Sequence, residues 1–323
     1  MSVRLTASLS STVRRNKRKR EILGSAVLHA AEYEQDVSGG GTDSEVPGSA
    51  RKRERKLEIT NLIVAIEGEM AELSDITIGI RSILSRMWDA VPETGTRLNR
   101  DGIAELLRFR KSIPPIVMTS HLHALFPYDP TFIERELQRV AEEGLVRKMV
   151  VNQNAGDMVI ESSDYFRVLR EMKHSNKISN IDSFDKFEDL LKSKPAVTRL
   201  STDDLNAASI TEDEGIRDLL SVGFLVLSGL PGVYLISVPN VGSFLKLAFR
   251  SRKWVINSLA KPKWKEMLEK SIHERWDANV KSRWREFRGV SFEWVMMEVK
   301  GGGWCEPFGT PGGRGWKLTG KKE

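Results

Sequence analysis

The chain has 323 residues, of which 40% are hydrophobic, so it is long enough for about two or three domains with packed cores. Its one cysteine, Cys305, excludes an intrachain disulfide and a cysteine-rich zinc site, and it is typical of a reducing compartment. We expect neither a secretory signal nor a membrane helix, because the N-terminus has no apolar core segment and the most apolar span, 221–241, is broken by glycine and proline.

Residues 1–56 are predicted to be a disordered basic tail. They hold 12 Lys and Arg against 7 Asp and Glu and show no hydrophobic periodicity. Two basic clusters within them resemble nuclear localisation signals, although such runs also occur in plain solvated tails. The predicted signal residues are Arg14, Arg15, Lys17, Arg18, Lys19, Arg20, Arg51, Lys52 and Arg53. The sequence therefore predicts a nuclear protein.

A helical linker region is expected at 57–95, and a first domain at 96–172. Asn99 or Asp101 can cap a helix over 102–111, a second helix is predicted over 116–126, and Asp129-Pro130 opens a third. Strands are predicted at 145–151 and 158–161. Three helices followed by a hairpin are the order of a winged-helix domain.

The same order is predicted twice more, at 180–238 and 239–320. In the second domain, Ser201 and Asp204 form a capping-box pattern. In the third, helices are predicted at 240–259 and 262–275, with a short helix capped by Ser291 and wing strands at 304–308 and 316–318. The predicted fold class is therefore mainly α with small β-wings, in three tandem winged-helix domains.

The charge is unevenly distributed. Residues 57–245 hold 20 Lys and Arg against 28 Asp and Glu, whereas residues 246–323 hold 18 against 9. Between Arg250 and Lys265, six cations fall among apolar residues at helical spacing, an arrangement that suits a phosphate backbone. A solvated helix face is the alternative interpretation. The candidate DNA-binding residues are Arg250, Arg252, Lys253, Lys261, Lys263, Lys265, Arg283, Arg285, Arg288, Arg147 and Lys148.

The third helix of the first domain weakens the case for Arg147 and Lys148. It carries Glu134, Glu136, Glu142 and Glu143, which repel phosphate. We therefore expect the first domain to contact DNA weakly or to bind protein.

The sequence predicts no enzyme, no cofactor and no metal site. The Gly-rich loop, HRD and DFG motifs of a protein kinase are absent, and Val64-Ala65-Ile66-Glu67 has glutamate where a kinase needs lysine. A Walker-like run at 315–322 has no helix after it. His121 and His123 point to different faces of a helix, which favours a core or interface role over metal binding.

The chain resembles the eukaryotic family named serine/threonine-protein kinase 19 over about residues 85–320. The segments that carry the resemblance are LNRDGIAELLRFRKSIPPIVMTSHLHALF, FIERELQRVAEEGLVRKMVV and VYLISVPNVGSFLKLAFRSRKWVINSLAKPKWKEMLEKSIHERW. The resemblance implies tandem winged helices without a kinase core, in a nuclear protein that binds double-stranded DNA and is associated with transcription-coupled repair. Its implied partners are repair factors and stalled RNA polymerase.

Two further functions stay open beside DNA binding. The acidic middle region also fits a protein-interaction scaffold, since winged helices often bind proteins. A protein kinase, as the family name says, would need a phosphate-binding lysine and a metal-binding aspartate that the sequence does not offer.

Overall fold

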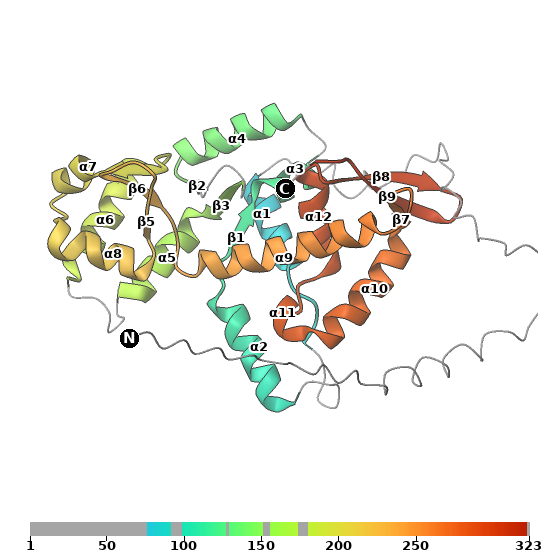
Figure 1. The fold of residues 1–323 in the computed structure, drawn as a ribbon. Coiled ribbons are helices and arrows are strands. Elements are labelled where there is room, and N and C mark those ends of the chain that lie inside the picture. Colours follow the sequence, from blue (N-terminus) through green and yellow to red (C-terminus); the bar gives the residue numbers. More distant parts are fainter. Residues whose placement is uncertain (1–75, 92–98, 127–128, 151–155, 174–179, 322–323) are drawn as a thin grey trace, which may run out of the picture. The chain divides into compact units, whose positions relative to one another are not determined.

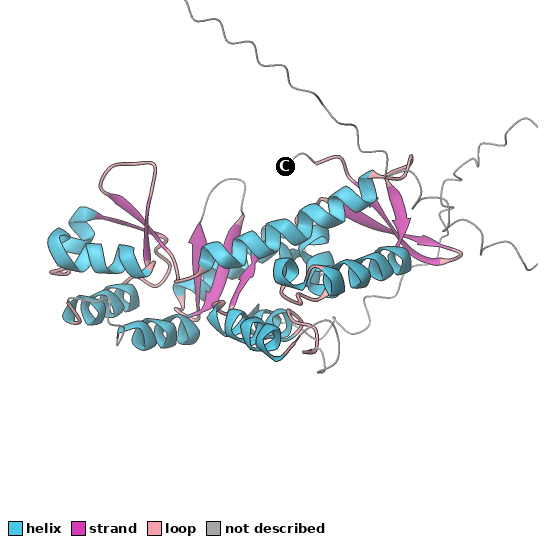
Figure 2. Ribbon diagram, turned by 60° about the horizontal axis from the view of Figure 1, so that its bottom comes forward, coloured by secondary structure: helices cyan, strands magenta, loops and turns pink. Residues whose placement is uncertain are grey.

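The described part of the structure, a computed structural model, is mostly helical with three small antiparallel sheets (Figures 1 and 2). The predicted α+β class is confirmed. The residues that it describes are 76–91, 99–126, 129–150, 156–173 and 180–321. The predicted tail and both basic clusters within it lie outside the described residues, as does most of the 57–95 region. The described residues all belong to one unit, residues 54–323.

The first module contains the helices and hairpin expected near the start of the described region. Its elements are α1 (Ile76–Ser85), α2 (Arg100–Ser112), β1 (Ile116–Met118), α3 (Thr119–Leu125), α4 (Pro130–Glu142), β2 (Val146–Val150), β3 (Asp157–Glu161) and α5 (Ser162–Lys173). The predicted caps form: the Asn99 side chain accepts a hydrogen bond from the Gly102 N–H at 2.8 Å, and Asp129 accepts one from Thr131 at 2.7 Å. The prediction of helix over 116–118 was wrong, because these residues pair with β3 as a strand.

The second module repeats this order in shorter elements. They are α6 (Asp182–Ser193), β4 (Arg199–Ser201), α7 (Thr202–Ala207), a π-helical turn (Glu212–Ile216), α8 (Arg217–Val222), β5 (Leu225–Leu227) and β6 (Val233–Ile236). Ser201 and Asp204 form the predicted capping box. Gly223 ends α8 at φ 98°, in the left-handed region that favours glycine.

The third module begins with the longest helix. Its elements are α9 (Val241–Ala260), β7 (Glu266–Leu268), α10 (Glu269–Ser282), α11 (Trp284–Phe287), α12 (Phe292–Gly301), β8 (Cys305–Thr310) and β9 (Gly313–Leu318). Ser291 caps α12 as predicted. The predicted helix at 262–275 was wrong in its first half, because Lys265 has a left-handed φ of 53° and the chain then enters β7.

All three sheets have the same strand order. The short first strand pairs with the last strand, and the last strand pairs with the middle one, giving β1-β3-β2, β4-β6-β5 and β7-β9-β8. In each sheet the first strand leads directly into a helix. Cys305 at the start of β8 is 1% exposed, and burial raises the pKa of its thiol to about 12.

The first and third modules are joined where α12 packs on α3 (Figure 1). The ring of His121 in α3 lies 4.3 Å from that of Trp294 in α12, and both side chains are buried. Gly301 lets the end of α12 approach α3 closely: a Cβ at this position would lie 1.7 Å from the carbonyl oxygen of Ser120. The last helix of the third module, α12, is therefore used for packing within the chain.

We expect Gly301→Ala to destabilise the protein by about 1–3 kcal/mol or more, because the added methyl group meets backbone that cannot move without separating the helices. Urea denaturation measures the effect. Gly242→Ala, at the exposed start of α9 with nothing within 4 Å, is the control and should be neutral or slightly stabilising. Equal stabilities of the two variants would contradict this packing.

Burial lowers the pKa of His121 to about 3, from an ordinary value of 6.5. The unfolded chain therefore takes up a proton that the folded chain excludes, and stability contributed by neutral His121 is lost as the pH falls from 6.5 towards 3. The loss is about 1.4 kcal/mol per pH unit.

His121→Phe retains an aromatic ring against Trp294 and removes this titration. The difference in unfolding free energy between wild type and variant should be constant above about pH 6.5 and change steadily below it. Denaturation curves at several pH values test this. A difference that is the same at pH 5 and pH 7 would show that His121 is not buried as a neutral ring.

Candidate nucleic-acid interface

One face of α9 is cationic: Lys246 and Lys253 are exposed there, and Arg250 between them is half-buried. Lys246, Arg250 and Lys253 follow one another at spacings of four and three residues, which places them on one side of the helix. Lys261, at the end of the helix, continues the row. We call these four residues the α9 stripe. It runs for about 22 Å at the helical rise per residue, enough for about six phosphates of one DNA strand.

The opposite face of α9 holds the stripe in place. Phe244, Ala248, Val255 and Leu259 are all buried on that face. Phe244 also packs edge-on against Trp294 of α12, with ring centroids 5.9 Å apart. The apolar contacts of the buried face thus fix the helix in place, and the charged face points to solvent.

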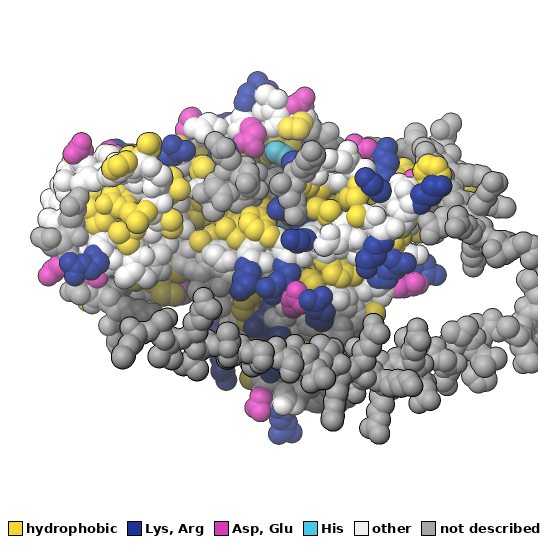
Figure 3. Space-filling model, viewed as in Figure 1, with side chains coloured by type: hydrophobic (Ala, Val, Ile, Leu, Met, Phe, Trp, Pro, Cys, Tyr) yellow, Lys and Arg dark blue, Asp and Glu magenta, His cyan; other side chains and the backbone are white. Residues whose placement is uncertain are grey.

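The turn after α9 adds further cations. Lys261, Lys263 and Lys265 are exposed there, and so is Trp264, which is 45% exposed. The Lys263 ammonium lies 5.3 Å from the centre of the Trp264 ring. We call the three lysines Lys261, Lys263 and Lys265 the lysine turn, and Trp264 lies between the last two of them. Figure 3 shows Lys and Arg side chains gathered along α9, at its far end and below it near α11 and α2.

The arginines near α11 are exposed to different degrees and are paired with carboxylates. Arg288 contacts Glu105 of α2 at 2.7 Å and Arg285 contacts it at 3.4 Å. The hydrogen bond from Arg288 is the main reason that the pKa of Glu105 is lowered. Arg283 pairs with Glu286, which also lies 3.6 Å from Arg250. These arginines therefore border the α9 stripe with part of their charge balanced.

Two predicted DNA-binding residues are buried, and we correct their assignment. Arg252 pairs with Glu298 at 2.8 Å, with side chains 8% and 2% exposed, and its guanidinium lies 4.7 Å and 4.8 Å from the rings of Phe249 and Trp304. Arg147 is 2% exposed and donates a hydrogen bond to the Leu191 carbonyl in the second module. Neither guanidinium can reach a phosphate.

Lys148 lies on the same strand as Arg147 and is held between two acids. Its ammonium contacts Glu134 and Asp157, each at 2.8 Å. His123 also reaches Glu134, at 3.4 Å, and the hydrogen bonds from His123 and Lys148 lower the pKa of Glu134 to about 2. The charge of Lys148 is therefore balanced by two carboxylates of the first module.

Lys246 is a cation that the sequence reasoning missed. It lies one helical turn before Arg250, outside the dense run of basic residues that drew attention. The signal that could have found it is the i, i+4 spacing from Arg250 along a helix whose inner face was already marked by apolar residues.

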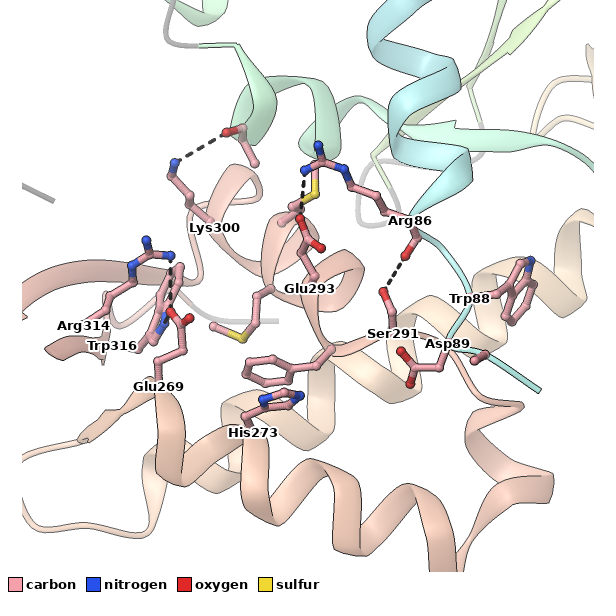
Figure 4. Close-up of a pocket in the computed structure, with 15 residues that line it drawn as sticks. Arg86, Trp88, Asp89, Glu269, His273, Ser291, Glu293, Lys300, Arg314 and Trp316 are labelled. Atoms are coloured by element: carbon pink, nitrogen blue, oxygen red, sulfur yellow. Dashed lines mark hydrogen bonds and ion pairs between the residues drawn. The ribbon is translucent and has the colours of Figure 1, made fainter. Parts of the chain in front are cut away.

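A cavity of about 690 Å³ lies between residues 86–90 and the third module (Figure 4). Three cations and three carboxylates line it. Arg86 pairs with Glu293 at 2.8 Å, and Arg314 lies 3.4 Å from Glu269. Lys300 donates a hydrogen bond to the Ala124 carbonyl at 3.4 Å. His273 stacks on Phe292 at 4.7 Å between ring centroids. Such internally balanced walls do not form an anion site.

The parts of the chain that the structure describes contain no group of three or more metal-ligating side chains. No helix in these parts is long and apolar enough to cross a bilayer. His121 is a buried interface residue, as predicted.

Comparison with known proteins identifies relatives. The family model described as inactive serine-threonine protein kinase 19 matches residues 84–233 and 230–318. The chain is 27% identical over 218 residues to the protein named serine/threonine-protein kinase mug51 of Schizosaccharomyces pombe, covering 64% of this chain and 68% of that one. It is 26% identical over 179 residues to winged helix repair factor 1 of Homo sapiens, covering 52% and 68%. The mouse protein of the same name is 25% identical. The family description confirms the prediction that the chain is not an enzyme.

Breaking the buried ion pair should affect stability. We expect Arg252→Met and Glu298→Leu to lower the unfolding free energy by about 3–5 kcal/mol each, because each leaves a buried charge without this counter-ion. The double variant should be less destabilised than either single variant. Chemical denaturation measures all three. Lys253, the exposed residue next to Arg252, provides the control: Lys253→Met should change the unfolding free energy by less than about 0.5 kcal/mol. Additive losses in the double variant would contradict the pairing.

Proposed function

The chain belongs to the inactive serine-threonine protein kinase 19 family, and on that premise we propose that it is a DNA-binding protein of DNA repair. The single observation that carries the proposal is the α9 stripe with the lysine turn. It is a row of cations, all exposed except the half-buried Arg250, on a helix that is fixed by its buried face. Such a row suits the regularly spaced phosphates of a DNA duplex, since each contact releases bound counterions.

We propose further that the modules are three tandem winged-helix domains, at 96–172, 180–238 and 239–320. The repeated order of helices and strands supports this division, as does the shared strand order of the sheets. The name of the human and mouse relatives, winged helix repair factor 1, supports the domain type and a role in repair.

In this proposal the third domain binds DNA without inserting its last helix, α12, into a groove. This helix is occupied by packing against α3. The first helix, α9, and the turn that follows it take the contact with the phosphate backbone. Contacts to the backbone position a protein on DNA and carry little sequence information, so we expect weak sequence preference.

The proposal also includes a cellular setting for this activity. A repair factor that binds duplex DNA acts in the nucleus, and the basic clusters at 14–20 and 51–56 are of the kind that direct import. We propose transcription-coupled repair as the process, with repair factors and RNA polymerase-associated proteins as partners.

A protein-interaction role has its own support in the second module. Val226, Leu227 and Leu230 at the β5–β6 hairpin are 43%, 69% and 59% exposed, and β5 is an edge strand of its sheet. Figure 3 shows an apolar surface at this place. Exposed apolar side chains on a hairpin favour contact with another protein. The scaffold and DNA-binding roles use different surfaces and are compatible.

The proposed interface is tested by removing four of its cations together, in the variant Lys246→Ala, Lys253→Ala, Lys261→Ala and Lys263→Ala. Anisotropy of a labelled duplex, measured between about 50 and 200 mM salt, should show weaker binding and a salt slope reduced by about 3 to 4, since each lost phosphate contact removes about 0.9.

A variant of equal net charge is the control. Arg167→Ala, Lys186→Ala, Lys192→Ala and Arg217→Ala together remove four cations from α5, α6 and α8, where three of the four residues pair with nearby acids. This variant should bind duplex DNA within about twofold of the wild type. Equal losses in both variants would show that net charge alone is responsible, and no loss in the first would refute the interface.

A further inference from the structure

We infer that the lysine turn holds an unpaired DNA base against Trp264, so that the protein prefers DNA in which a duplex passes into a single strand. The inference rests on the proposed function, because it takes DNA along α9 as given. It adds a substrate class, namely duplex DNA with unpaired bases at one end of the bound stretch.

Trp264 differs from the other tryptophans in its exposure. All eight tryptophans lie in the described part of the chain, and Trp264 is the most exposed of them, at 45%. Trp276, Trp294 and Trp316 are at most 3% exposed and belong to the core. An indole left in water at the end of a cationic row is typical of a stacking platform for nucleobases.

The turn that carries Trp264 is fixed at both ends. The Lys265 N–H donates to the Pro262 carbonyl at 3.0 Å, which closes the turn. The Leu318 N–H donates to the Lys265 carbonyl at 3.1 Å, which ties the turn to the end of β9. Because the backbone is already ordered, little conformational entropy is lost when a ligand stacks on the ring.

The charges around the ring select for nucleic acid. Lys261, Lys263 and Lys265 alternate with Pro262 and Trp264, and the five-residue turn contains no carboxylate. Phosphates on either side of a stacked base would meet lysines on either side of the indole. The combination of a cationic track and an aromatic face is the common design of single-strand binding sites.

The position of the turn explains why the base must be unpaired. Bases inside a duplex present only their edges to the grooves, because their faces are covered by neighbouring base pairs. An indole can stack only on a base whose face is open. A duplex lying along the α9 stripe would have its phosphates beside Lys246 to Lys261, and Trp264 lies just beyond that stretch. The end of the duplex is therefore the place where the ring can act.

The test compares two DNA molecules that share one duplex, of which one carries a single-stranded extension with 2-aminopurine at its first unpaired position. The full chain should bind the extended molecule about fivefold or more tightly than the blunt duplex, the lower end of what one stacked base contributes. Binding should also quench the 2-aminopurine fluorescence.

Trp264→Ala should abolish both the preference and the quenching, while its affinity for the blunt duplex stays within about twofold of the wild type, since the phosphate contacts are unchanged. Trp264→Phe keeps an aromatic face and should retain most of the preference. A thermal melt checks that the exposed position leaves folding intact.

The outcomes separate this inference from the proposed function. Equal binding of the two DNA molecules by the wild type, or a preference that survives in Trp264→Ala, overturns the inference and leaves duplex binding in place. Binding to neither molecule overturns both proposals.

Discussion

The close contact of α12 with α3 is the constraint on which the third module depends. Gly301 brings the two helices together until a methyl group no longer fits, and the rings of His121 and Trp294 fill the space beside it. Once α12 is used in this way, the module can present its other helices and its β8–β9 hairpin to a ligand, but not α12. The longest of them, α9, has its apolar face against Trp294 and its basic face outward. Packing between modules and the position of the cationic row are thus consequences of one contact.

Local signals in the sequence predicted most of the helices, because capping acts over three or four residues. Asn99, Ser201 and Ser291 begin helices where their side chains were expected to do so. The three-residue strands β1, β4 and β7 escaped prediction, since a segment this short is a strand only through its partner. Those partners, β3, β6 and β9, lie about 40, 35 and 50 residues further along the chain.

The same distinction applies to the candidate interface. The row Lys253, Lys261, Lys263 and Lys265 could be read from the sequence because exposure is the default for lysine. The burial of Arg252 could not be predicted from the sequence, although Arg252 is the residue next to Lys253. Whether an arginine is buried depends on a carboxylate placed by the fold, and Glu298 is 46 residues away. Arg147 is buried for a similar reason, through a carbonyl and two aromatic rings of other elements.

The burial of Cys305 has a consequence for the chemistry of the whole chain. It is the one cysteine in the sequence, it is 1% exposed, and its thiol stays protonated near neutral pH. Alkylating reagents react with exposed thiolates, so the folded protein should behave toward them as though it contained no cysteine. A single cysteine placed on the solvent side of α9 or β5 would then be the sole reactive thiol. The native sequence is in this respect already suited to carrying one spectroscopic label at a chosen point.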